Sequence, residues 1–401
     1  MRSTGGGVRA AAVADQGEES MQTRTSKALA LAAAVTAGVA HAQIEPEQLV
    51  VETLPERSPH WVYVTDISFF HMPDSKVVLL NGDAETTNEA YLGMMSTGYN
   101  PGIAVAPDGS EIYSAETWYS RGTRGEREDI VTVFDARTLE PVDEIDLPEK
   151  RHFSVTQPQG TVTANGGDDL LVFNVTPATS VSIVDLEARE FLGEISLPGC
   201  AFMYPAPEGR HFGTLCADGA FMTVSYDGEG REVVRSRQAL FDPDSAQIYE
   251  KPVYVGETLY FVSFTGTVHP VNWSNGEASM GETWQLASEA ERAENWRPGG
   301  WMLEAAHSPT GRLFTLMHQG GAGTHKDPGT EVWVYDADAG ERTARWALEN
   351  PAISLLVTAD DEPLMFAIRA DFAVDVYDAG SGEYLRTFEG IGDTPFLMRR
   401  P

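Results

Sequence analysis

Residues 131–148 read VTVFDARTLEPVDEIDLP: an alternating apolar strand, an aspartate, a short polar turn and a second strand. Residues 181–198 repeat the pattern as VSIVDLEAREFLGEISLP. Five further copies, some weaker, begin near Val77, Met222, Thr267, Val332 and Val374. A hairpin that recurs every 40–60 residues or so is typical of propellers and solenoids. Seven hairpins therefore predict an all-β, seven-bladed β-propeller.

Shorter strand pairs lie between these hairpins and predict the inner strands of the same blades. Residues 103–114 place a Pro-Asp-Gly turn between two apolar runs, and residues 253–263, 305–316 and 355–367 have the same form. An inner pair and an outer hairpin make one four-stranded antiparallel blade. The strand Trp61–Thr65 has no partner pair before it, so we expect it to pair with the end of the chain and close the ring.

Composition limits the classes of partner. The 401 residues carry a formal net charge of −32, which argues against nucleic acid because its phosphates require Lys and Arg. Length alone would allow two or three domains, but stacked blades form one unit. We therefore expect residues 61–401 to form a single propeller domain.

The N-terminus has the pattern of an export signal. Arg24 and Lys27 precede an apolar run from Ala28 to Ala40, and residues 40–42 form an Ala-x-Ala cleavage site. The run is too short to span a bilayer, which takes about 20 residues. Residues 1–42 are thus predicted to be a leader and signal peptide that is removed, residues 43–60 a flexible arm, and the mature protein periplasmic.

Export makes the two cysteines informative. Cys200 and Cys216 flank a turn, and a hairpin centred on Glu208 would place them directly opposite each other. Antiparallel partners lie close enough for a disulfide, and free thiols are uncommon outside the cytoplasm. We predict a Cys200–Cys216 disulfide, and two buried free thiols are the alternative.

The sequence contains no recognisable catalytic constellation, because C-x-x-C, H-E-x-x-H and G-x-S-x-G are all missing. His318 and His325 could bind a metal, but a surface loop is the favoured interpretation. Phe69 and Phe70 follow the first strand, and they belong either to the core, which is favoured, or to the wall of a binding site. Residues 288–295 predict a helix that Ser288 caps. We therefore predict no catalytic residue and no metal site in this chain.

Several segments together resemble the heavy chain of the bacterial tryptophan tryptophylquinone amine dehydrogenases. The likeness covers nearly all of the mature chain, and it rests on the order and spacing of segments that are individually weak. These segments are 121–129, 176–180, the Cys200/Cys216 hairpin with Asp218-Gly219, 296–301 and 323–326.

The resemblance implies a seven-bladed propeller that joins a small light chain in a complex of two heavy and two light chains. Tryptophan tryptophylquinone would reside in the light chain, a primary amine would be deaminated to aldehyde and ammonia, and electrons would pass to a blue-copper protein of the amicyanin or azurin type. The heavy chain would scaffold the light chain and shape the substrate channel.

The resemblance also bears on the substrate. The segment 66–77 and the Gly-Thr-His-Lys loop look closer to the aromatic-amine branch than to the methylamine branch. The methylamine branch has a channel Phe at the position of Phe70, which makes Phe69 and Phe70 the candidate channel residues. A stand-alone propeller hydrolase or lactonase and a pure interaction propeller are the competing interpretations.

Overall fold

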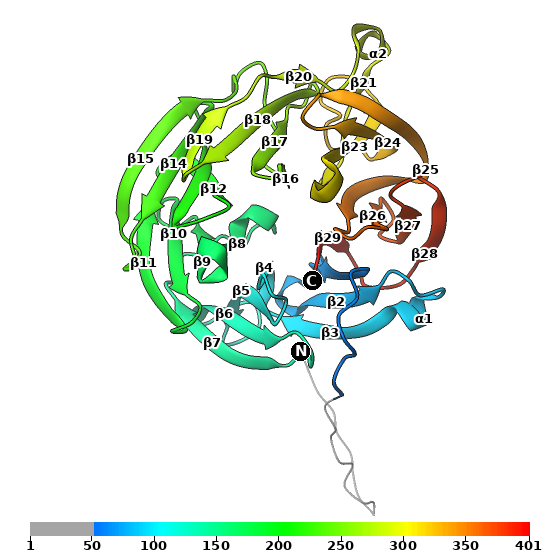
Figure 1. The fold of residues 1–401 in the computed structure, drawn as a ribbon. Helices are drawn as coiled ribbons and strands as arrows, with labels where there is room; N and C mark the ends of the chain where they lie inside the picture. Colours follow the sequence, from blue (N-terminus) through cyan, green and yellow to red (C-terminus); the bar gives the residue numbers. More distant parts are fainter. Residues whose placement is uncertain (1–51) are drawn as a thin grey trace, which may run out of the picture. The chain divides into compact units, whose positions relative to one another are not determined.

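The computed structural model describes residues 52–401, an all-β propeller whose sheets follow one another around a ring (Figure 1). Two short α-helices interrupt the strands, α1 (Thr87–Ala90) and α2 (Glu289–Ala293). Within residues 52–401, the structure has no helix of the length and apolarity that a membrane span requires. The expected leader, residues 1–42, lies outside the described residues.

Four sheets have four antiparallel strands each. Their strands, in sheet order, are β29 (Pro395–Arg399), β1 (Trp61–Asp66), β2 (Ser75–Asn81) and β3 (Tyr91–Thr97); β4 (Tyr99–Val105), β5 (Glu111–Tyr119), β6 (Arg127–Asp135) and β7 (Pro141–Leu147); β8 (Thr161–Ala164), β9 (Asp169–Asn174), β10 (Ser180–Asp185) and β11 (Glu190–Ser196); and β12 (Cys200–Pro205), β13 (His211–Cys216), β14 (Ala220–Tyr226) and β15 (Glu232–Ala239).

Two larger sheets complete the described strands. One holds β16 (Val253–Val255), β17 (Thr258–Val262), β18 (Thr267–Ser274), β19 (Glu277–Met280) and β20 (Trp284–Gln285). The other has eight strands: β21 (Trp296–Pro298), β22 (Glu304–His307), β23 (Arg312–Gln319), β24 (Gly329–Asp336), β25 (Glu341–Val357), β26 (Leu364–Arg369), β27 (Val374–Asp378) and β28 (Tyr384–Phe388).

The hydrogen bonding thus divides residues 52–401 into six sheets and not into the seven separate blades that the repeat predicts. The cause is β25, a 17-residue strand. Its first part pairs with β24 from Glu341 to Ala347, and its last part pairs with β26 from Ala352 to Val357. Because β25 continues through Pro351 as one strand, and Ala352 is paired with both Gly329 and Arg369, no boundary separates the two halves of the eight-stranded sheet.

The predicted outer hairpins are confirmed, and their aspartates explain the turns. In four copies the aspartate ends the first strand, and its carboxylate accepts the backbone N–H three residues further on, at 2.7 to 2.9 Å. Such a side-chain bond substitutes for a backbone turn bond and fixes where the strand stops. The four residues are Asp135, Asp185, Asp336 and Asp378.

Apolar side chains from neighbouring sheets form the core between them. Val131 and Val133 of β6 share a fully buried cluster with Leu170 and Val172 of β9 in the next sheet. Both faces of these strands are covered, which is why their sequences are nearly continuously apolar. Such burial contributes roughly 25 cal/mol per Å² of apolar surface, so these contacts between sheets stabilise the propeller.

The first described strand lies beside the last. β1 pairs with β2 on one side and with β29 on the other, where Tyr63 is opposite Arg399. Residues 52–60, the described part of the expected flexible arm, contain no strand or helix, yet they contact the propeller. The Leu54 N–H donates to Arg137 O at 2.8 Å, and the His60 ring contacts Asp83 and Asp360.

Two local predictions are confirmed. Cys200 and Cys216 are opposite each other in the β12–β13 register and form a disulfide. Helix α2 begins after Ser288, whose hydroxyl accepts the Glu291 N–H while the Glu291 carboxylate accepts the Ser288 N–H. This reciprocal capping satisfies two backbone donors that a helix start leaves free.

Candidate functional site

The loop between β1 and β2 presents Phe69 and Phe70. Its anchor is the buried carboxylate of Asp66 at the end of β1, which accepts the backbone N–H groups of Ser68, Asp393 and Thr394 at 2.8 to 2.9 Å. The Phe69 N–H in turn donates to the Thr394 hydroxyl at 2.8 Å. One aspartate therefore ties this loop to the segment that leads into β29.

Phe69 and Phe70 do not belong to the core, so the interpretation that sequence reasoning favoured is wrong. Phe69 is 55% exposed and Phe70 is 82% exposed. Their rings form an edge-to-face pair with centroids 5.4 Å apart. The cause is the turn at Ser68, where a φ of 44° directs the chain outward before the apolar residues begin. Two adjacent exposed phenylalanines suggest contact with another molecule.

Other exposed apolar side chains lie at the same end of the propeller. Successive connections along antiparallel strands alternate between the two ends of the propeller. The connections between the second and third strands of a sheet therefore lie at the same end as the connection from one sheet to the next. These are the β1–β2, β5–β6, β9–β10 and β7–β8 connections. Trp118, near the end of β5, is 40% exposed, as is Val155 between β7 and β8, and Val175 after β9 is 44% exposed. We call Phe69, Phe70, Trp118, Val155 and Val175 the apolar rim.

A buried arginine supports the middle of this rim. Arg151 donates to the carbonyl oxygens of Asn100, Tyr99 and His152, and its backbone N–H donates to Asp129. The next aromatic residue, Phe153, lies 4.8 Å from the Arg127 guanidinium and edge-on to Tyr99. The Asn100 amide bonds the Phe153 carbonyl and contacts the sulfur of Met72. These contacts join the 148–160 loop to the Phe69 loop.

The same end carries the two histidines that were considered as metal ligands. The His325 ring stacks on Phe264 with centroids 4.1 Å apart, whereas His318 Nε2 contacts the Thr324 hydroxyl at 2.9 Å. Burial lowers the pKa of both imidazoles, which favours their neutral form. Among the described residues, no group of three or more His, Cys, Asp or Glu is placed to bind a metal ion.

Nearby, a lysine and a tryptophan from different segments meet. The Lys251 ammonium, which is buried, lies 4.1 Å from the centre of the Trp301 ring and 3.5 Å from the Glu250 carboxylate. The Trp301 ring packs on Phe396 of β29. Sequence reasoning did not single out Lys251, because Trp301 is distant in the chain and no local pattern marks their contact.

A tryptophan-derived quinone needs two neighbouring tryptophans that a substrate can reach. The rings of Trp296 and Trp333 lie 5.3 Å apart, but the side chains are only 8% and 0% exposed. The Arg345 guanidinium also covers both rings, at 4.4 and 4.9 Å. This pair is a packing feature and offers no access for an amine, so it does not fit such a cofactor.

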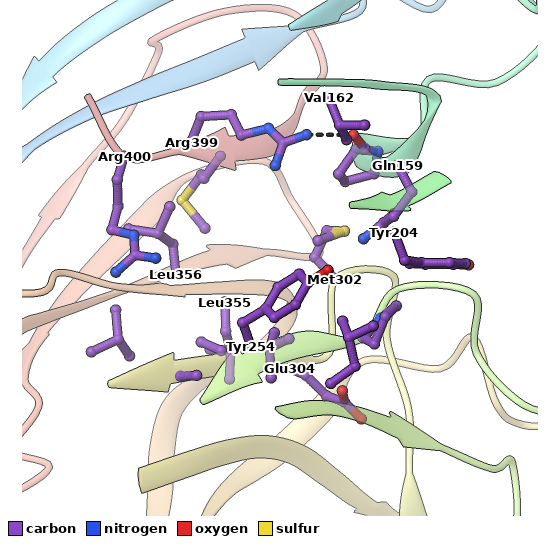
Figure 2. A pocket seen from close by; sticks show the side chains of 18 of the residues that line it. Gln159, Val162, Tyr204, Tyr254, Met302, Glu304, Leu355, Leu356, Arg399 and Arg400 are labelled. Atoms are coloured by element: carbon purple, nitrogen blue, oxygen red, sulfur yellow. Dashed lines mark hydrogen bonds between the residues drawn. The ribbon is translucent and has the colours of Figure 1, made fainter. Parts of the chain in front are cut away.

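The centre of the ring contains a cavity of about 260 Å³ (Figure 2). Its walls come from the inner strands β12, β16, β22, β25 and β29 and from the segment before β8. Most of the lining is apolar, with Tyr254 and Met302 near the middle of the view, Arg399 extending toward Val162 and Arg400 at the left. The sequence did not predict this cavity, because its lining residues are spread from 158 to 400.

Two buried carboxyl groups have raised pKa values. Burial raises the pKa of Glu116 to about 7, although hydrogen bonds from the Thr132 hydroxyl and the Gly98 N–H oppose the change. Burial also raises the pKa of Glu304 well above its ordinary value, and neither of its carboxyl oxygens has a hydrogen-bond partner within residues 52–401. The two groups lie in different sheets, so they do not form an acid–base pair.

Known sequences similar to this chain agree on one family description. Residues 58–400 match the family described as "Methylamine dehydrogenase heavy chain (MADH)". The methylamine dehydrogenase heavy chain of Paracoccus versutus is 30% identical over 359 residues, which cover 88% of this chain and 82% of that protein. The protein of the same name from Methylophilus methylotrophus is 28% identical over 355 residues, which cover 88% and 86%.

Solved structures that resemble this one share its fold at low sequence identity. The periplasmic gluconolactonase of Pseudomonas aeruginosa superposes with a TM-score of 0.55 at 14% identity, over 84% of this chain and 98% of that one. A putative 6-phosphogluconolactonase of Bacteroides fragilis gives a TM-score of 0.57 at 10% identity, over 88% and 99%. At these identities the likeness is one of fold alone.

Proposed function

We propose, because this chain belongs to the methylamine dehydrogenase heavy chain family, that it is the heavy subunit of a periplasmic amine dehydrogenase. The match over residues 58–400 carries this proposal. The enzyme would oxidise a primary amine to an aldehyde and ammonia. The competing lactonase interpretation is supported only by shared fold with proteins of 10 to 14% identity, so we do not favour it.

The apolar rim is the surface that we assign to the light chain. Phe69, Phe70 and Trp118 are large apolar side chains that are 40 to 82% exposed, and a partner would cover them. Buried aromatic anchors of this kind dominate the energy of many interfaces. Two heavy and two light chains would form the complex, with the propeller as scaffold.

The quinone cofactor, tryptophan tryptophylquinone, would belong to the light chain and would supply the electron-accepting carbonyl when bound. The buried Trp296–Trp333 pair gives this chain no comparable group. Phe69 and Phe70 carry no acid, base or nucleophile, so their contribution would be steric and apolar: they would narrow the path to the quinone and exclude water. Electrons would leave to a blue-copper protein of the amicyanin or azurin type.

We also propose how the sheets relate to the family fold. The eight-stranded sheet would be two blades joined through β25, which would bring the total to seven, and the β1–β29 pair would close the ring. A closed ring leaves no inner strand edge open to other chains.

The relatives bear on the substrate as well. Both relatives described above are named methylamine dehydrogenase heavy chains, which gives no support to the aromatic branch that the sequence favoured. We therefore propose a primary amine as substrate, with methylamine as the first compound to test and tyramine as the comparison.

The test compares this chain alone with the complex purified from cells that produce it. Alone, the chain should reduce no dye in the presence of methylamine or tyramine and should lack quinone absorbance. The complex should contain a small second polypeptide and should show amine-dependent dye reduction. Robust amine oxidation by the isolated chain, or lactone hydrolysis without amine oxidation by the complex, would overturn the proposal.

A further inference from the structure

Two guanidinium groups lie where two cavities meet in the centre of the ring. The cavity of about 260 Å³ shares five lining residues with a second, more open cavity of about 480 Å³, and these are Val162, Pro205, Tyr254, Arg399 and Arg400. In the β1–β29 register, Arg399 is opposite Tyr63, whereas Asp66 beside the Phe69 loop is opposite Pro395. The arginines therefore lie toward the end of the ring that is opposite the apolar rim.

Neither arginine has an acidic partner within residues 52–401. The one hydrogen bond of the Arg399 side chain there is to the Pro158 carbonyl oxygen, and the Arg400 side chain has none. By contrast, Arg210 and Arg127 each form an ion pair with a buried aspartate.

The other residues that line the cavity indicate which chemical groups a bound anion could carry. Near the arginines the wall includes the apolar Val162 and Leu356 and the polar Gln159. The Tyr254 hydroxyl bonds the Pro205 carbonyl, which fixes the Tyr254 ring in the wall. Glu304 also borders the smaller cavity. Its carboxyl oxygens are covered, and burial raises its pKa well above the ordinary value, so it adds no exposed negative charge.

We propose that this cavity binds a small organic carboxylate, with the carboxylate on Arg399 and Arg400 and an apolar or aromatic body against Val162, Tyr254 and Leu356. Guanidinium groups match carboxylates in geometry and charge, and such bonds are stronger than neutral ones. A mostly apolar pocket with a few convergent polar groups is the usual form of a small-molecule site. The site is separate from the apolar rim, so it does not depend on the proposed function.

Titration calorimetry on the purified chain tests this site, with benzoate as the probe and acetate and inorganic phosphate as comparisons. We expect one benzoate per chain, with affinity at least about tenfold above that of acetate because the ring buries apolar surface. Arg399→Gln and Arg400→Gln should each weaken benzoate binding by about tenfold or more. Arg400 is exposed, so its variant should fold even if the Arg399 variant does not.

Arg121→Gln is the matched control, because it removes one exposed positive charge from a loop at the other end of the ring. It should leave benzoate affinity unchanged. Equal losses of benzoate affinity in Arg121→Gln and Arg400→Gln would show that the loss reflects the overall charge of the protein, and would overturn the proposal. Absence of benzoate binding, or phosphate binding that exceeds it, would overturn the proposal as well.

Discussion

Because Phe70 is exposed and not part of the core, its substitution should affect substrate choice more than stability. Because its side chain is 82% exposed, Phe70→Ala should change the free energy of unfolding by no more than about 0.5 kcal/mol. In the complete enzyme the same substitution should alter the ratio of kcat/KM for tyramine over methylamine by about tenfold or more, because an apolar wall discriminates substrates by size.

Steady-state kinetics and thermal unfolding of the Phe70→Ala complex check this prediction together. Tyr384→Ala is the control, since Tyr384 is a partly exposed aromatic residue (39%) on β28 and lies outside the apolar rim. If Phe70→Ala keeps the wild-type substrate ratio, and Phe69→Ala does too, the channel assignment is wrong.

Glu116 provides a residue-scale prediction about pH. Its pKa in the folded chain is raised from 4.5 to about 7, so the folded chain retains a proton that the unfolded chain loses within that interval. Its contribution to stability therefore falls as pH rises from about 4.5 to about 7 and is constant above. Glu116→Gln removes this dependence, so its unfolding free energy relative to wild type should increase as pH rises from about 4.5 to about 7 and stay constant above.

Denaturant unfolding at several pH values measures that difference. Glu128→Gln, an exposed site on the neighbouring strand β6, should follow the wild-type pH profile. Parallel profiles for Glu116→Gln and wild type would contradict the raised pKa.

At the scale of an element, the β12–β13 hairpin depends on its disulfide. The bond closes a loop across a sequence separation of 16, which in the chain-entropy model stabilises the fold by about 3 kcal/mol. The double variant Cys200→Ser/Cys216→Ser should lose about that much unfolding free energy, measured by denaturant titration. Wild type unfolded with a reductant should match the variant, whereas equal stability of the variant and oxidised wild type would contradict the prediction.

At the scale of the whole molecule, the last strand, β29, pairs with the first described strand, β1. Removal of residues 395–401 deletes β29, exposes the edge of β1 and takes away Met398, which is buried between sheets. We expect a lower Tm and a broad transition in place of one cooperative step, measured by calorimetry. Removal of residues 400–401 alone, which lie beyond β29, should leave a single transition, and equal effects of the two deletions would contradict the prediction.

The sequence by itself determined the repeating unit, because strand alternation and the Asp-led turns are local. The hairpins at Val131 and Val181, the capped helix at Ser288 and the Cys200–Cys216 pairing all depend on residues within about 20 positions of one another. Local hydrogen bonds and the apolar pattern of each strand suffice to specify such elements.

Only the tertiary structure decided the features that join distant residues. Phe70 is exposed on a loop that Asp66 ties to Thr394, which is far away in the chain, and the central cavity assembles residues from 158 to 400. The continuous course of β25 through Pro351 merged two expected blades into one sheet. Each outcome depends on which side chains from separate strands meet. Contacts between distant segments leave no periodic pattern in a single sequence. They therefore become visible only in the folded chain.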